Sequence, residues 1–248
     1  QINIYKACGF DIPSFAHLSM IHGEDGQKLS KRHGAASVTE YRELGYLPEA
    51  VNNYLARLGW SHGDAEIFSL DELCELFSLK SITSSPSQFD IKKLQWLNNH
   101  YLKQKTFEEI EVLLTPQFAK RFSDRKQLLG IFDLYKDRCN SLRDFEVNAE
   151  KVLTKPENIS HELIEKYISD ISINRLQNLR DLFNASDFTS ESIETILKAY
   201  VKKEQIKFPE VAMPLRVVLL GTDQSPSIGQ IIALIGKDEF NNRLSEYT

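Results

Sequence analysis

The chain has 248 residues, of which 42% are hydrophobic and 26% charged, so we expect packed domains and exclude wholesale disorder. A formal net charge of −5 argues against a protein that binds nucleic acid over its whole surface, although a local basic face is compatible with it. No apolar run reaches the roughly 20 residues of a membrane-spanning helix, and nothing has the pattern of a secretory signal. A cytoplasmic location is therefore expected.

The cysteines and histidines predict no metal or disulfide chemistry. The three cysteines are isolated and contain no Cys-x-x-Cys pair, so neither a zinc site nor a disulfide framework is expected. The histidines have no partner at metal-ligand spacing, and no metal site is predicted. Cys8 and Cys74 stand among apolar neighbours and are expected to be small core residues.

Residues 1–85 mix helical and extended patterns, which predicts a small mixed α/β region. The end of a helix is expected over Gln1–Phe10 and a short strand over Ala16–Ile21. The clearest helix begins at Pro48, because proline suits a first helical position and apolar residues follow at helical spacing. A second helix is expected after Ser69, whose hydroxyl suits the N-cap.

Beyond residue 85 the apolar period is helical almost throughout, so the fold is expected to be mainly α. The polar run Thr83–Ser87 is the expected boundary, and Asp90 is the expected cap of the next helix. Later helices are predicted by three apolar stripes: Leu128, Leu129, Phe132 and Tyr135; Leu163, Ile164, Tyr167, Ile168 and Ile171; Ile193, Ile196, Leu197, Tyr200 and Val201.

We therefore expect three parts, residues 1–85, 86–205 and 206–248. The third is expected to hold two short helices, one ending at Gly221 and one ending at Gly236, because glycine is the usual residue after a helix end. No internal repeat or low-complexity tract interrupts this pattern.

The most informative segment is the run Lys28-Leu29-Ser30-Lys31-Arg32, with Gly23 and Gly26 before it and Gly34 after it. A mobile loop can deliver two ammonium groups at this spacing to a polyphosphate, and the glycines supply backbone freedom. The spacing alone is equally that of an exposed charged turn without a ligand. The surrounding residues decide between these interpretations.

Further segments accompany the lysine run in a fixed order. They are Phe15-Ala16-His17-Leu18, Ile21-His22-Gly23-Glu24-Asp25-Gly26, Tyr41 to Ala50, Asn53 to Ser61, Phe89 to Asn98, Met213 to Gly221, and Ala233 to Lys237. Together with the lysine run they resemble the glutamyl-tRNA synthetases, a family of class I aminoacyl-tRNA synthetases, and the resemblance extends from end to end.

The resemblance implies ATP-dependent attachment of glutamate to tRNA through glutamyl-adenylate, with Mg²⁺ in the full-length enzyme. It implies that Lys31 contacts the ATP phosphates in the transition state and that Lys28 adds a supporting charge. Ser30 and Arg32 would shape the loop, with Ser30 beside the chemistry and Arg32 near ATP. The His-x-Gly-His motif of this class is absent here, so the chain is expected to be the carboxy-terminal part of a larger enzyme and inactive alone.

The resemblance also implies a stem-contact region followed by an all-α anticodon-binding region, so the expected partner is tRNA for glutamate, with glutamine isoacceptors left open. Recognition of unpaired bases uses guanidinium or aromatic planes together with phosphate contacts. The candidate contacts are Lys92, Arg175, Arg180 and Arg216. Arg216 lies in the carboxy-terminal signature, but its apolar helix equally suits a buried ion-pair partner. Trp60 and Trp96 are expected in the core.

The alternative is a stand-alone RNA-binding or adaptor module without catalysis. Two related enzymes fit less well. Glutaminyl-tRNA synthetases usually carry β-barrels after the lysine loop, which the helical periodicity contradicts, and the glutamyl-queuosine enzymes lack the anticodon region that residues 90–248 resemble.

Overall fold

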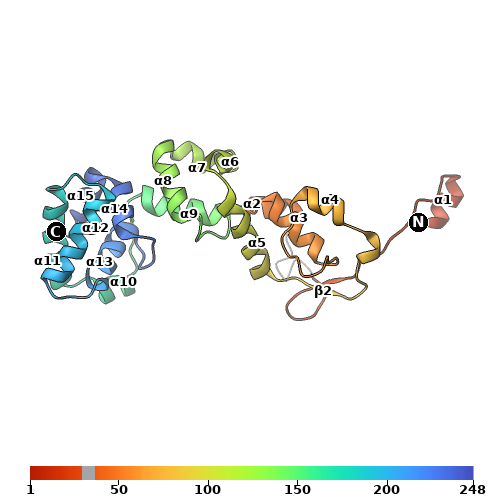
Figure 1. Ribbon diagram of the computed structural model, residues 1–248, viewed down its shortest axis with the longest axis horizontal. Helices are drawn as coiled ribbons and strands as arrows, with labels where there is room; N and C mark the ends of the chain where they lie inside the picture. The colour runs from red at the N-terminus through yellow and green to blue at the C-terminus, as the bar shows by residue number, and fades with distance from the viewer. Residues whose placement is uncertain (30–36, 248) are drawn as a thin grey trace. The chain divides into compact units, whose positions relative to one another are not determined.

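The computed structural model describes residues 1–29 and 37–247, and the chain divides into two compact units, Gln1–Tyr101 and Leu102–Thr248. Fifteen α-helices and one two-stranded parallel sheet lie in the described residues (Figure 1), which confirms the mainly α prediction. None of the described helices has the length and apolar character needed to cross a membrane. The three-part division at residues 85 and 205 stays a prediction.

The first unit holds short helices and the two strands. Its elements are α1 (Ile2–Cys8), β1 (Ile21–His22), α2 (Val38–Glu43), α3 (Pro48–Arg57), α4 (Leu70–Leu76), the 3-10 helix η2 (Leu79–Ser81), β2 (Ser87–Gln88) and α5 (Ile91–Gln104), whose last turn passes into the second unit. The helix starts agree with the sequence: Pro48 is the first residue of α3, Ser69 caps α4 in a capping box with Glu72, and Asp90 accepts two backbone N–H groups of α5.

The strand expected over Ala16–Ile21 is shorter and later. β1 pairs with β2 in parallel register, with Ile21 opposite Ser87 and His22 opposite Gln88. Backbone bonds from Ser87 N to the Met20 oxygen and from Phe89 N to the His22 oxygen bracket this pairing. The apolar pattern predicts a longer strand than the hydrogen bonds form, because β2 is only two residues long and pairs with only two residues of this segment.

A buried polar centre joins α3 to α5 in the first unit. The Asn53 amide nitrogen donates to the Glu66 backbone oxygen at 3.0 Å, and its Oδ1 accepts the Phe68 N–H at 2.9 Å. The Tyr101 hydroxyl lies 2.7 Å from the same Oδ1. The Tyr54 hydroxyl accepts the Asp90 N–H at 2.6 Å. These bonds satisfy polar groups that burial would otherwise penalise, and they hold the start of α5 against α3.

Three core predictions in the first unit are wrong. Cys8 and Cys74 are exposed, because α1 buries no residue and α4 turns only Leu73 fully inward. Trp96 is 45% exposed, because Leu94 and Leu97 form the buried face of α5 and position 96 falls outside it. Trp60, in contrast, is buried with Phe68 and Leu73, as expected.

The second unit is all α. Its helices are α6 (Phe107–Glu111), α7 (Pro116–Arg121), α8 (Arg125–Tyr135), α9 (Leu142–Leu153), α10 (His161–Tyr167), α11 (Asp170–Asn184), α12 (Ser190–Lys203), α13 (Pro209–Leu220), α14 (Ile228–Ile235) and α15 (Lys237–Leu244). Helices α11 to α15 gather into one bundle (Figure 1), in which α12 packs on α14 and α11 on α13.

Two details of this unit differ from the sequence expectation. The stripe Leu163–Ile171 is two helices, because α10 ends at Tyr167 and Ser169 caps α11 in a new capping box. The helices ending at Gly221 and Gly236 are confirmed as α13 and α14, but α15 follows them directly. The apolar pattern does not predict α15, because most of its residues are polar and only Phe240, Arg243 and Leu244 are buried.

Candidate functional site

The chain enters the lysine run through a short hairpin. Leu29 N donates to the Ile21 oxygen at 2.9 Å, and Gly23 N donates to the Gln27 oxygen at 2.8 Å. Gly26 turns the hairpin with a φ of 74°, in the left-handed region that favours glycine. The Asp25 carboxylate accepts the Gln27 N–H at 3.0 Å and closes the turn. The Gly-Glu-Asp-Gly sequence thus makes a defined turn directly before the lysines.

This hairpin is held on β2, which comes from much later in the sequence. The Gln88 side-chain amide donates to the Glu24 backbone oxygen at 3.2 Å, beside the β1–β2 pairing. The turn and β2 border an open hollow of about 450 Å³. The segment that leads into the lysine run is therefore held on β2 by backbone pairing and a side-chain hydrogen bond.

The structure locates one of the four predicted loop residues. Lys28 is exposed and forms an antiparallel bridge with His22 through the backbone. Ser30, Lys31 and Arg32 lie outside the described residues, and their roles stay predictions. In residues 1–29 and 37–247, no group of three or more His, Cys, Asp or Glu side chains has a geometry that would hold a metal ion.

In the second unit, Arg216 of α13 is close enough to Arg138 for the two charges to interact. Its Nε donates to the Ser225 hydroxyl at 2.9 Å and its Nη2 to the Pro226 oxygen at 3.4 Å. Burial, and next the positive charge of Arg138, lower the pKa of the Arg216 guanidinium. Arg138 is exposed in the turn between α8 and α9. The negative charge of Asp223 opposes the effect of Arg138, so the Arg216 guanidinium lies among charges of both signs.

Sequence reasoning missed Arg138. An arginine in a short turn is unremarkable in a sequence, and only the packing of α9, which follows that turn, against α13 brings Arg138 near Arg216. The single available signal was its position just after the apolar stripe that ends at Tyr135, and that stripe did not distinguish it from the other charged residues nearby.

The other predicted RNA contacts in the second unit, Arg175 and Arg180, bond to residues of neighbouring helices. Arg175 forms an ion pair with Glu210 at 3.0 Å, which links α11 to α13. Arg180 donates from Nε to the Asn241 amide oxygen at 2.9 Å, which links α11 to α15. Lys92 is exposed in the first turn of α5, in the first unit. Arg175 and Arg180 thus already serve the packing of the helical bundle.

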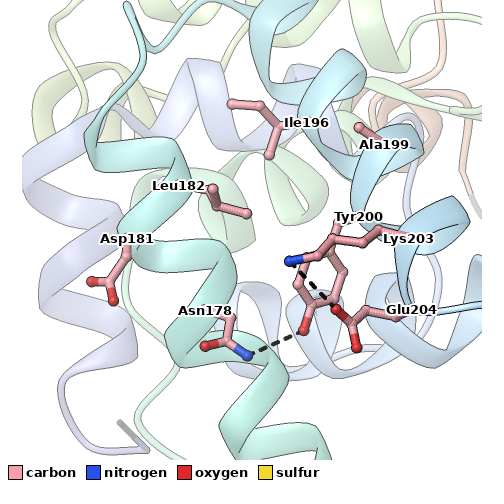
Figure 2. A pocket seen from close by; sticks show the side chains of 8 residues that line it. All are labelled: Asn178, Asp181, Leu182, Ile196, Ala199, Tyr200, Lys203 and Glu204. Carbon is pink, nitrogen blue, oxygen red and sulfur yellow. Dashed lines mark hydrogen bonds and ion pairs between the residues drawn. The ribbon is translucent and has the colours of Figure 1, made fainter.

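A shallow cavity of about 470 Å³ lies between α11 and α12. Figure 2 shows the Asn178 amide directed at the Tyr200 hydroxyl, 3.4 Å away, and Lys203 paired with Glu204 at 4.0 Å. Leu182, Ile196 and Ala199 complete a largely apolar wall. This lining offers a surface for packing, and it brings none of the predicted site residues together.

Comparison with known proteins gives two family matches, one to each part of the chain. Residues 95–248 match the family described as anticodon binding domain, and residues 1–96 match the catalytic domain of class I tRNA synthetases (E and Q). The chain is 47% identical over 242 residues to a glutamate–tRNA ligase of Methylobacillus flagellatus, which covers 96% of this chain and 52% of that protein. A Bordetella avium glutamate–tRNA ligase is 42% identical, covering 98% of the chain and 53% of the relative.

Two solved structures of glutamate–tRNA ligases are also similar to this chain. A glutamate tRNA ligase from Elizabethkingia meningosepticum, in complex with its amino acid, superposes with a TM-score of 0.81 at 30% identity, covering 99% of this chain and 53% of that one. The glutamate-tRNA synthetase from Elizabethkingia anophelis gives 0.77 with the same coverage. The chain spans about half the length of the relatives that it matches.

The two matches, to the catalytic domain of class I tRNA synthetases and to an anticodon binding domain, place the chain among the class I aminoacyl-tRNA synthetases. Within that class, the chain belongs to the glutamyl-tRNA synthetase family.

Proposed function

We propose that this chain works as part of a glutamate–tRNA ligase, which attaches glutamate to tRNA at the expense of ATP. The observation that carries the proposal is the continuous match to relatives of that name over 96% of the chain, through both the catalytic and the anticodon-binding segments. The cytoplasm, where translation takes place, stays the predicted compartment.

The lysine run is the proposed contact with ATP. When the glutamate carboxylate attacks the α-phosphate, negative charge develops on phosphate oxygens, and fixed cations stabilise it. Lys31 would contact the phosphates, with Lys28 as a supporting charge and Ser30 and Arg32 shaping the loop. The hairpin held on β2 supports this proposal, because it fixes the segment directly before the lysine run. Mg²⁺, if bound with ATP, would neutralise phosphate charge.

The second unit is the proposed anticodon-binding part. Arg138 and Arg216 are the favoured contacts, because their neighbouring charges and planar groups suit phosphates and unpaired bases. Arg175, Arg180 and Lys92 remain candidates of lower rank, since the first two already bond to Glu210 and Asn241. The expected tRNA is that for glutamate, with glutamine isoacceptors open.

A hybrid enzyme tests the proposal. Residues 1–248 would replace the matching half of the Methylobacillus flagellatus ligase, and ATP–pyrophosphate exchange and tRNA charging would be measured with glutamate. We expect both activities in the hybrid and neither in the chain alone. A folded hybrid that charges no tRNA would refute the ligase proposal and favour the stand-alone RNA-binding module.

A further inference from the structure

A small hollow between α3 and α5 contains an unusual set of charges. Its volume is about 190 Å³, and all of its lining belongs to the first unit. The lining residues are Tyr54, Arg57, Leu58, Glu66, Gln88, Asp90, Lys93 and Leu97. Two cations and two carboxylates thus line this hollow. The hydrogen bonds and ion pairs that each of them already makes decide what the hollow can bind.

Arg57 contributes a guanidinium that is not satisfied. Its Nη1 is shielded from solvent and donates no hydrogen bond to any residue that the structure describes. Buried donors of this kind are rare in native proteins, and each calls for an explanation such as a bound ion. The guanidinium geometry suits two oxygens of a phosphate at once.

Lys93 forms an ion pair with Glu66 that another anion could replace. Its Nζ lies 2.5 Å from Glu66 Oε2 and 4.2 Å from the centre of the Trp96 ring. The two side chains of the ion pair are 36% and 45% exposed, so water and salt weaken the pair. The hydrogen bond from Lys93, and to a lesser degree the charge of Arg57, lower the pKa of Glu66. The Glu66 carboxylate is therefore stabilised in its charged form by both Lys93 and Arg57.

The second carboxylate is already engaged. Asp90 Oδ1 accepts the backbone N–H groups of Lys92 and Lys93, at 2.8 and 3.2 Å, as the cap of α5. Its charge is thereby directed at the helix start, where the helix dipole favours it. Glu66 is the carboxylate whose release would leave Arg57 and Lys93 facing one anion.

We infer that the α3–α5 hollow is a phosphate subsite for RNA, in which the Glu66 carboxylate occupies the place of a phosphate until RNA binds. An RNA phosphate would take the Lys93 ammonium and the Arg57 Nη1, and Glu66 would turn toward solvent. This rests on the proposed function, because tRNA supplies the phosphate. Exposed Lys92, on the same helix, would extend the contact along the RNA backbone.

Binding of a glutamate tRNA transcript to the chain and its variants, at several salt concentrations, tests the exchange. Replacing one charge in a phosphate contact is expected to change affinity by about threefold to tenfold. Glu66→Gln should tighten binding, and Arg57→Gln should weaken it and reduce the salt slope by about 0.9. The gain from Glu66→Gln should disappear in the Arg57→Gln background, since both act on one phosphate.

Glu75→Gln is the matched control, because Glu75 is exposed on α4 and its loss changes net charge equally. Equal tightening by Glu75→Gln and Glu66→Gln, or a gain that survives Arg57→Gln, would overturn the inference while tRNA binding itself stands. A wild-type chain that binds this tRNA no better than an unrelated RNA would instead contradict the proposed function.

Inorganic phosphate provides a test that does not need tRNA. Trp96 is exposed and contacts Lys93, whereas Trp60, the other tryptophan, is 2% exposed. Movement of Lys93 toward phosphate should change Trp96 fluorescence in the wild type, and the change should be absent in Trp96→Phe and reduced in Arg57→Gln. A phosphate response that does not depend on Arg57, or no response to phosphate and tRNA alike, would overturn the inference.

Discussion

Arg243 Nη1 donates a hydrogen bond to the Leu219 backbone oxygen at 2.6 Å, although the arginine lies at 1% exposure. Its Nη2 donates to the Val152 oxygen at 2.8 Å, and its Nε donates to Glu239 at 2.8 Å. Val152 and Leu219 stand in the last turns of α9 and α13. One guanidinium therefore caps two helices, at the ends where the helix dipole favours a positive charge.

Arg243→Met should destabilise the second unit by about 3–5 kcal/mol, because it leaves buried carbonyl oxygens without their donor. Urea unfolding followed by circular dichroism measures this. Arg121→Met is the control, since Arg121 forms an exposed ion pair with Glu150 and lies 4.9 Å from the centre of the Phe122 ring, and its loss should cost less than about 1 kcal/mol. Equal losses in the two variants would refute the capping role.

Asn53→Ala should destabilise the first unit by about 3 kcal/mol, because it removes the partner of the buried Phe68 N–H, of the partly buried Glu66 oxygen and of the Tyr101 hydroxyl. The neighbouring Asn52 is exposed on the same helix, so Asn52→Ala should be nearly neutral. Thermal unfolding of both variants measures the two losses of stability. A loss in Asn53→Ala that is absent in Asn52→Ala comes from the buried hydrogen bonds and not from removing an asparagine from α3.

Gly229→Ala should destabilise the contact of α14 with α12, because a Cβ at this position would lie 2.5 Å from Glu194 Cγ. Overpacking of this kind costs about 1–3 kcal/mol. Adding Glu194→Ala removes the clashing atom and should recover part of the stability. Gly59→Ala, where the new Cβ meets nothing within 4 Å, is the control and should show no loss.

Cys139 should make the second unit less stable in alkali. Burial, and next the negative charge of Asp144, raise the pKa of its thiol from 9.0 to about 12. Between these values the unfolded chain loses the proton and the folded chain keeps it, so stability falls as pH rises from 9 to 12. The slope approaches about 1.4 kcal/mol per pH unit. In Cys139→Ala this part of the slope should vanish, whereas in Cys74→Ala, at an exposed cysteine, it should persist.

Lys31→Ala in the hybrid ligase should lower ATP–pyrophosphate exchange by roughly 100-fold or more, the scale for losing one preorganised stabilising group. Arg42→Ala, at an exposed position of α2, should leave the rate unchanged. Unchanged exchange in Lys31→Ala would refute the assignment of this lysine to the ATP phosphates.

Much of the fold was readable from local pattern. Pro48, Ser69 and Asp90 mark helix starts because their backbone or side-chain chemistry acts within one turn, and Gly221 and Gly236 mark ends for the same reason. Cys74 and Trp96 were misplaced because an apolar neighbourhood in sequence does not say which face of a short helix is covered. The length of β1 was missed because its partner, β2, lies far along the chain.

The sequence by itself determined the mainly α fold and the lysine run, because helix periodicity, caps and a glycine-flanked cationic segment are all local. Only the tertiary structure decided how the charges are shared. It placed Arg138 near Arg216 and buried Arg243 at two helix ends. It also left the Arg57 Nη1 shielded, near Lys93 and Glu66, with no hydrogen-bond partner among the described residues. Charge interactions depend on distance and burial, which residues far apart in sequence acquire only when the chain has packed.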